Sequence, residues 1–334
     1  MAVTPQTNTD LSTIAARLRG VTSVAICGHV NPDGDCLGSQ LALAHALRAL
    51  GVRVDCLLAQ PEALDAGMRT LPGADDLVPA AAYAASPEAF VAVDVPTPER
   101  LGDAAAVHAR CPLTITIDHH AVPRAMSQLN YVDPDAPATA QLVWRLVKEL
   151  GVEPTAELAQ CAYAGLMTDT GGFRYQQTDA ACFQAAAEMT AAGARPSEAA
   201  VAFFQNRSLA SVRLMERMLA RAEVDLERGL ALSYVTRADF EELGAVRADA
   251  EPLVDTLRSI RGVRAAGMLR EQDGCVRGSL RAKDETDVAQ TARRFGGGGH
   301  RAAAGFTFEG ALDEAIPAVR AALLEALSSH TGER

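Results

Sequence analysis

The residues best suited to chemistry form the tripeptide Asp118-His119-His120, a carboxylate followed by two imidazoles. The tripeptide closes the apolar, β-branched run Leu113–Ile117, which predicts a buried strand. It is therefore expected where the chain leaves that strand, and in an open parallel sheet this edge collects ligands and catalytic groups. Three polar residues in a loop are more often simply solvated, so the tripeptide becomes informative only if other segments supply partners.

Three further segments place Asp or His at, or just beyond, the end of a predicted buried element. They supply His29, Asp33 and Asp35 after the run Val21–Cys27, Asp94 after Phe90–Val93, and Asp169 after the helix predicted over Thr155–Met167. Each segment alone has an ordinary interpretation, as a loop histidine and turn, a strand end, or a helix cap. Four such segments at successive element ends favour one shared site.

A shared site of this composition favours divalent cations. Carboxylates gathered in one cleft repel one another unless positive charge neutralises them. A donor set dominated by oxygen, with some imidazole and no expected cysteine, suits manganese better than zinc. Two ions about 3.5–4 Å apart form a clamp for in-line attack on phosphorus. The pattern therefore predicts two divalent metal ions, expected to be Mn²⁺, acting on a phosphoester.

The elements that must hold these residues alternate between strands and helices. A helix is expected from Asp10 or Ser12 to Gly20, then the strand Val21–Cys27, a helix over Leu37–Leu50 and the strand Val52–Leu58. This order is a βαβ unit, so the sheet is predicted to be parallel. Helices over 138–150, 155–167, 178–192 and 196–205 follow, and an amphipathic helix over 208–224 is expected to connect to a second domain.

The fold class predicted is α/β with two domains. We expect a catalytic parallel-sheet domain over residues 1–195, a helical linker over 196–225 and a smaller α/β domain over 226–334. The active site is expected in the cleft between the two domains. With 334 residues, the chain is long enough for two cores.

The composition excludes several classes of protein. A hydrophobic fraction of 49% and a charged fraction of 22% are typical of soluble globular proteins. No apolar run reaches the roughly 18 residues of a membrane span, and the polar start lacks a signal-peptide pattern. Seven dispersed cysteines predict free thiols in a reducing cytoplasm. The net charge of −11 argues against tracking along long nucleic acid.

The motifs, taken in order, carry a family resemblance. His29-x-x-Pro32-Asp33-x-Asp35, Asp94, Asp118-His119-His120 and Asp169 resemble the motif series of the DHH phosphoesterases. The run Gly296–His300, followed by 301–306, is similar to the glycine-rich motif of the DHH-associated C-terminal domain. The resemblance spans about residues 10–328. Length and spacing resemble the stand-alone oligoribonuclease (nano-RNase) and adenosine 3′,5′-bisphosphate phosphatase group.

The resemblance implies a role for each matching residue. One manganese ion would be held by His29, Asp33 and Asp94, and the second by Asp35, Asp94, His119 and Asp169, with Asp94 bridging. His120 would be catalytic, facing the scissile phosphate to stabilise its charge or to assist the leaving oxygen. Asp118 would support the site by orienting a ligand imidazole. No departure from the family pattern occurs at these positions.

The second domain carries a local excess of positive charge. Residues 258–301 hold ten basic and five acidic side chains, a net +5 within a protein of charge −11. Some of these arginines are expected on a solvated face, whereas the guanidinium of Arg281 suits a terminal phosphate. The glycine run, placed before an expected helix, would let backbone N–H groups approach a phosphate or base. The predicted substrate-binding residues are Ser279, Arg281, Gly297, Gly298, Gly299 and His300.

These observations predict a manganese-dependent phosphodiesterase that hydrolyses very short oligoribonucleotides such as pApA, with adenosine 3′,5′-bisphosphate phosphatase as a further activity. Hydrolysis of cyclic di-AMP is the alternative within the class. The related inorganic pyrophosphatases share the metal motifs, but the glycine-rich second domain favours a nucleotide. A catalytically inactive nucleotide-binding regulatory protein is the alternative of another class, and the intact ligand set speaks against it. Neither long nucleic acid nor a membrane is expected as a partner, and a homodimer is compatible with the expected strand edges.

Overall fold

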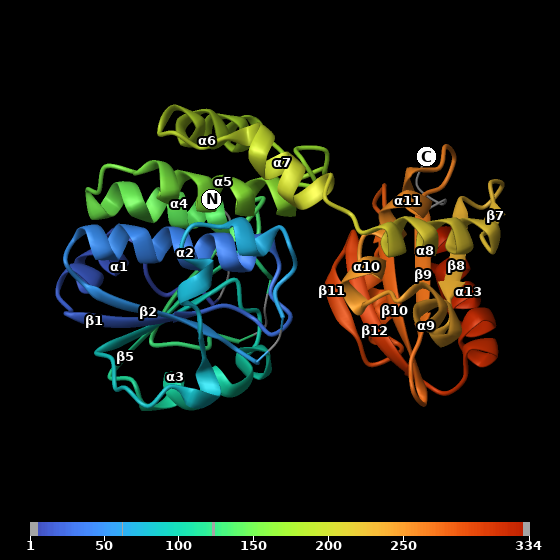
Figure 1. Ribbon diagram of the computed structural model, residues 1–334, viewed down its shortest axis with the longest axis horizontal. Helices are drawn as coiled ribbons and strands as arrows, with labels where there is room; N and C mark the ends of the chain where they lie inside the picture. The colour runs from blue at the N-terminus through green and yellow to red at the C-terminus, as the bar shows by residue number, and fades with distance from the viewer. Residues whose placement is uncertain (1–5, 62, 122–123, 330–334) are drawn as a thin grey trace. The chain divides into compact units, whose positions relative to one another are not determined.

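The computed structural model describes residues 6–61, 63–121 and 124–329. The chain divides into two compact units, with the boundary between Asn206 and Arg207. Each unit contains a six-stranded sheet (Figure 1). Within the described residues, every helix falls short of the length and apolarity needed to cross a membrane.

The sheet of the first unit is entirely parallel, as predicted. Its strands are β1 (Ser23–Cys27), β2 (Arg53–Leu58), β3 (Val78–Pro79), β4 (Ala89–Val93), β5 (Leu113–Asp118) and β6 (Leu129–Val132). They lie in the order β3-β2-β1-β4-β5-β6. The order reverses between β1 and β4, and in open α/β sheets ligands bind beyond the carboxyl ends of the strands at such a switch point.

Helices cover both faces of this sheet and add an outer layer on one side (Figure 1). The helices α1 (Leu11–Arg19), α2 (Gly34–Ala49), α4 (Thr139–Leu150) and α5 (Ala156–Asp169) share one apolar core with the strands. The 3₁₀ segment η4 (Pro98–Ala104) and α3 (Ala105–Arg110) pack on the other face. The outer helices α6 (Ala180–Ala191) and α7 (Pro196–Phe204) pack on α5. Short 3₁₀ turns η1 (Met68–Thr70), η2 (Ala74–Asp76) and η3 (Ala80–Ala82) lie between β2 and β4.

Helix α2 begins three residues before the predicted start, because the side chain of Asp33 caps it. Asp33 Oδ1 accepts a hydrogen bond from the backbone N–H of Cys36 at 2.9 Å. Asp35 consequently lies in the first turn of a helix and not in a loop. The capping carboxylate is also one of the predicted metal ligands, so the same residue fixes the helix and the site.

Two glycines let α2 and α5 pack backbone against backbone. A Cβ atom at Gly38 would lie 2.5 Å from the carbonyl oxygen of Cys161, and one at Gly165 would lie 3.0 Å from Asp35 Oδ1. Only glycine fits such an approach. The close packing brings Asp35, near the start of α2, toward Asp169, the last residue of α5.

The second unit is a mixed sheet with helices on both faces. Its strands are β7 (Glu223–Asp225), β8 (Leu230–Val235), β9 (Ala265–Glu271), β10 (Cys275–Ala282), β11 (Gly298–His300) and β12 (Ala303–Glu309). They lie in the order β11-β12-β10-β9-β8-β7, with β8 and β9 parallel and the other pairs antiparallel. One core contains α12 (Val288–Arg293) and α13 (Leu312–Ser329), and the other contains α8 (Leu209–Ala220) and α11 (Leu253–Ser259). The short helices α9 (Arg237–Leu243) and α10 (Arg247–Ala250) precede α11.

Helix α8, expected as an interdomain connector, packs into the second unit and is shorter than predicted. Leu214 and Met218 are fully buried in the core that it shares with α11. On its polar side, Arg217 and Arg221 donate to the carboxylate of Asp239 at 2.7 and 3.0 Å. That carboxylate is 2% exposed and also accepts the backbone N–H of Thr236, which caps α9. An ion pair therefore locks α8 to the second unit.

The glycine run does not precede a helix, contrary to prediction. Gly298–His300 forms β11, which pairs with β12 in antiparallel register. The preceding helix α12 ends at Arg293, and Gly296 has a φ of 72°, the left-handed conformation that ends helices. The run is thus a turn entering an edge strand.

Candidate metal centre

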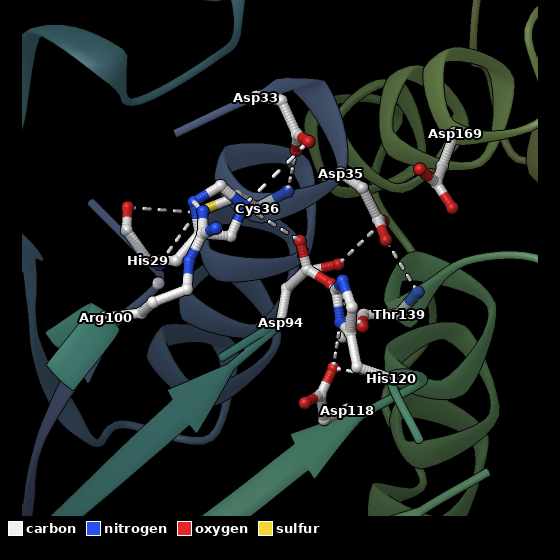
Figure 2. A network of polar contacts seen from close by, with 12 residues as sticks. His29, Asp33, Asp35, Cys36, Asp94, Arg100, Asp118, His120, Thr139 and Asp169 are labelled. Atoms are coloured by element: carbon white, nitrogen blue, oxygen red, sulfur yellow. Dashed lines mark hydrogen bonds and ion pairs between the residues drawn. The ribbon is translucent and has the colours of Figure 1, made fainter. Parts of the chain in front are cut away.

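The predicted metal ligands of the first unit meet at the carboxyl ends of the strands (Figure 2). His29, Asp33 and Asp35 follow β1, Asp94 follows β4, and His119 follows β5, while Asp169 ends α5. The first two segments flank the switch point between β1 and β4. The topology therefore brings candidate ligands from four separate segments to one place, which is the convergence expected from the strand ends.

Asp94 occupies the centre of the cluster, and its two oxygens face different partners. Asp94 Oδ2 lies 3.5 Å from His29 Nε2, which is itself 3.8 Å from Asp33 Oδ2. Asp94 Oδ1 lies 3.6 Å from His119 Nε2. The carboxylate is 2% exposed and thus buried between two groups of donors.

His119 gathers the second group of donors. Its Nε2 lies 3.5 Å from Asp169 Oδ2 and 4.0 Å from Asp35 Oδ2. Its Nδ1 contacts the carbonyl oxygen of Ala136 at 3.2 Å, which turns Nε2 toward the carboxylates. Two groups on either side of one carboxylate match the two ligand sets that the family resemblance implies.

The donor atoms fit divalent ions. Ligands about 2.1 Å from one hard cation lie about 3 to 4 Å from each other, which is the spacing found here. Asp35, Asp94 and His119 form one set whose donor atoms lie within 4.8 Å of one another, and His29 and Asp94 belong to another. At 3.5 to 4.0 Å, these contacts are weak hydrogen bonds at best. The arrangement suits donors that share a divalent cation.

The electrostatics of the cluster lead to the same conclusion. Burial, followed by the charges of Asp94, Asp169 and Asp33, raises the pKa of Asp35 well above its ordinary value. Burial also raises the pKa of Asp169, to about 6, although the charge of His119 opposes this rise. Without a cation the cluster therefore binds protons. Divalent ions would replace those protons and leave every carboxylate ionised.

Protonated imidazoles neutralise the negative charge of Asp94 in the metal-free cluster. Burial would raise the pKa of Asp94, but the hydrogen bond from His29 and the charges of the three histidines outweigh it and lower the pKa. Conversely, burial lowers the pKa of His29, and the hydrogen bond to Asp94 with the charge of Asp33 raises it overall. Metal binding would require the imidazoles to release these protons.

The backbone at Asp94 is strained. Its φ of 58° lies in the left-handed region, which costs a non-glycine residue about 1–3 kcal/mol. The backbone N–H of Asp94 donates to the carbonyl oxygen of Ile117 at 3.0 Å, which extends the pairing of β4 with β5 by one residue. The strain turns the carboxylate from the strand direction into the cluster, and such outliers concentrate at functional sites.

Thr139, at the start of α4, joins two of the carboxylates and was not predicted. Its hydroxyl donates to Asp94 Oδ1 at 2.9 Å, and its backbone N–H donates to Asp35 Oδ2 at 2.7 Å (Figure 2). The backbone N–H of Ala140 donates to Asp35 Oδ1 at 2.8 Å. The positive end of α4 thus holds Asp35 in place. Ala138 precedes this helix without a capping side chain, so a sequence pattern for this role was missing.

Asp118 orients His120, whereas the prediction gave it a ligand imidazole to orient. Asp118 Oδ1 accepts from His120 Nδ1 at 2.7 Å and from the backbone N–H groups of His119 and His120 at 2.8 and 3.1 Å. Asp118 is fully buried, and its Oδ2 has no hydrogen-bond partner within the described part of the chain. Burial lowers the pKa of His120, but the charge and hydrogen bond of Asp118 raise it overall. The pair is suited to keeping a proton on the imidazole.

Two further neighbours of His29 were missed by the sequence analysis. Arg100, from η4, approaches His29 Nδ1 with Nη2 at 2.9 Å (Figure 2). The thiol of Cys36 lies beside His29 and Asp94, although no cysteine was expected near the ligands. Burial and the charges of Asp94 and Asp33 raise the pKa of this thiol well above its ordinary value. Cys36 is therefore a neighbour of the candidate ligands that keeps its proton in the metal-free cluster.

The predicted substrate-binding residues all lie in the second unit. Ser279 and Arg281 lie two positions apart on β10 and therefore on the same face of the sheet. Ser279 pairs with Gly305 of β12. Gly298 pairs with the same Gly305 from the other side. The guanidinium of Arg281 contacts the carbonyl oxygen of Leu280 at 3.0 Å and lies 3.8 Å from Asp255. Gly297 and Gly299 flank Gly298, and His300 ends β11.

Comparison with known proteins identifies the class. Residues 23–166 match the model of the DHH family, N-terminal domain, and residues 230–329 match that of the DHHA1 domain. The chain belongs to the DHH family, a family of phosphoester-hydrolysing enzymes. The resemblance seen in the motifs is therefore confirmed, as is the α/β fold with two domains.

Particular relatives cover nearly the whole chain. It is 32% identical to the bifunctional oligoribonuclease and PAP phosphatase NrnA of Thermus thermophilus, over 91% of this chain and 90% of that protein. It is 27% identical to the protein of the same name from Bacillus subtilis, over 83% and 86%. Among solved structures, an exopolyphosphatase-related protein from Bacteroides fragilis superposes with a TM-score of 0.88 at 26% identity, over 96% and 97%.

Proposed function

We propose that this protein is a manganese-dependent phosphodiesterase that hydrolyses very short oligoribonucleotides, such as pApA, to nucleoside monophosphates. Removal of the 3′ phosphate from adenosine 3′,5′-bisphosphate is proposed as a further activity. The observation that carries the proposal is the double ligand set around Asp94. The similarity to two NrnA proteins, over 91% and 83% of this chain, supports it.

The residues that would hold the ions are those of the two ligand sets. His29, Asp33 and Asp94 would bind one ion, and Asp35, Asp94, His119 and Asp169 the other. When bound, two such ions supply positive charge for phosphoryl oxygens and acidify a water nucleophile. Manganese is favoured because the donors are carboxylates and imidazoles.

The neighbouring residues of this chain supply the rest of the chemistry. His120 would hold a proton, maintained by Asp118, and place positive charge near the phosphate. Thr139 and the first turn of α4 would keep Asp35 and Asp94 from rotating. Ser279, Arg281, Gly297–Gly299 and His300 are proposed to hold the nucleotide, through the guanidinium and through glycine N–H groups.

A single substrate panel tests the proposal. The purified protein with manganese would be given pApA, RNA of two to seven nucleotides, a 24-nucleotide RNA, adenosine 3′,5′-bisphosphate, cyclic di-AMP and pyrophosphate. We expect the highest kcat/KM on pApA and the shortest RNAs. Equal rates on the 24-mer and the dinucleotide would contradict the preference for short substrates, and a preference for cyclic di-AMP would support the alternative function. Lack of turnover on every phosphoester would favour a binding protein.

A further inference from the structure

A cavity of about 490 Å³ opens next to the turn that follows Asp169. This volume is within the range of small-molecule sites, about 300–1,000 Å³. Its wall comes from α5, from α7 and from the turn between α5 and α6. The aromatic pocket, as we name it, is lined by Tyr163, Met167, Gly172, Phe173, Arg174, Pro196, Ser197, Ala200 and Phe204.

The wall of the aromatic pocket combines flat rings with a guanidinium. The ring centroids of Tyr163 and Phe173 lie 5.9 Å apart, and Phe204 is 38% exposed at the opening. A Cβ atom at Gly172 would lie 3.5 Å from Phe204 Cε2 and 3.8 Å from Arg174 Nε. The Phe204 ring and the Arg174 guanidinium therefore both lie close to Gly172, on one side of the opening. Nucleobases of every type stack on such surfaces, because each base has a π-face.

The aromatic pocket lies close to the metal centre, because residues only a few positions apart in the sequence contribute to both. Gly172 follows Asp169 by three residues, so their Cα atoms are at most about 11 Å apart. The turn between them is fixed, because the backbone N–H of Gly172 donates to the carbonyl oxygen of Met167 at 2.7 Å. Phe173 is held at a φ of 63°, which is rare for a bulky residue. The turn that follows α5 and Asp169 therefore also fixes the position of Phe173 in the aromatic pocket.

We propose that the aromatic pocket binds a nucleobase of the oligoribonucleotide, on a nucleotide next to the cleaved phosphodiester. This inference rests on the proposed function, since it requires a substrate that carries bases. The base would stack against Phe204 and Phe173, and the Arg174 guanidinium would donate hydrogen bonds to its edge. The pocket would then add affinity for nucleotides over bare phosphate compounds without contacting the reacting atoms.

The test compares two serine substitutions on α7. Phe204→Ser removes an exposed ring from the opening, and Val201→Ser removes an apolar side chain that is 52% exposed on the same helix but outside the lining. Stacking contributes about 1–3 kcal/mol per base, so we expect Phe204→Ser to raise KM for pApA about tenfold or more. Val201→Ser should leave KM unchanged. The corresponding dinucleotide of abasic ribose should react equally well with all three proteins.

Several results would overturn the inference while the proposed function stands. One such result is that wild type hydrolyses pApA and Phe204→Ser does so with an unchanged KM. Another is that Phe204→Ser raises KM for the abasic dinucleotide as much as for pApA. A change of oligomeric state in Phe204→Ser, seen by light scattering without a change in KM, would assign the surface to a second copy of the chain. If wild type fails to hydrolyse pApA with manganese, the proposed function itself fails, and the inference with it.

Discussion

Replacing Thr139 by valine isolates one hydrogen bond of the metal centre. Valine keeps the size and branching of the fully buried side chain, and the backbone N–H that binds Asp35 is unchanged. Only the hydroxyl that donates to Asp94 Oδ1 at 2.9 Å is lost. Asp94 would then be free to rotate away from the position that serves both ligand sets.

The magnitude follows from the charge of the acceptor. A hydrogen bond to a charged group contributes about 1.5–3 kcal/mol, equivalent to a change of roughly 10- to 150-fold in affinity. Mutation of a residue that hydrogen-bonds to a metal ligand typically lowers the metal affinity about 10- to 100-fold. We therefore expect Thr139→Val to raise the dissociation constant for manganese by one to two orders of magnitude. Turnover at saturating manganese should stay close to wild type, because the ligands themselves remain.

Isothermal titration calorimetry with manganese and the manganese dependence of pApA hydrolysis measure this effect. Thr139→Ser, which restores the hydroxyl, is the matched control and should recover most of the affinity. Urea unfolding would establish that both variants are folded. Wild-type manganese affinity in Thr139→Val would refute the reasoning, and so would an equal loss in Thr139→Ser.

Three other changes test separate parts of the structure. Asp239→Asn should lower the free energy of unfolding at pH 7 by about 2–3 kcal/mol. Its two arginine partners hold the pKa of Asp239 below the ordinary value against the effect of burial, so the difference in urea unfolding should shrink as pH falls below about 4. A difference independent of pH would contradict this. Gly165→Ala should destabilise the protein by about 1–3 kcal/mol and reduce bound manganese, whereas Gly20→Ala, whose Cβ meets only ordinary contacts, should do neither. His120→Ala should lower kcat with manganese retained, and loss of metal in elemental analysis would assign His120 to the ligands.

The parts of the fold that the sequence predicted are those with strong local patterns. The strands β1, β4 and β5 are short apolar runs buried in the sheet. Strands β3 and β6 were not predicted. β3 has only two residues, and β6 alternates buried and half-buried residues over four positions. Such edge strands take their structure from the neighbouring strand and not from their own composition.

The convergence of the candidate ligands was predictable because they are polar residues at strand ends, where a polar side chain interrupts an apolar run. Thr139 and Arg100 were not, because their roles arise only when distant segments meet. Thr139 lies 45 positions from Asp94 in the chain, and Arg100 lies 71 from His29. The partner of Asp118 was also missed, since the choice between two adjacent imidazoles depends on side-chain direction.

The central claim is that Asp94 joins two metal-binding sets, and metal content measures it most directly. Elemental analysis of wild type dialysed against manganese should find about two ions per chain. Asp94→Asn, which keeps the shape of the side chain and removes its charge, should lose both ions and the hydrolysis of pApA together. Wild-type manganese content in Asp94→Asn, or full pApA turnover by metal-stripped wild type, would contradict the account.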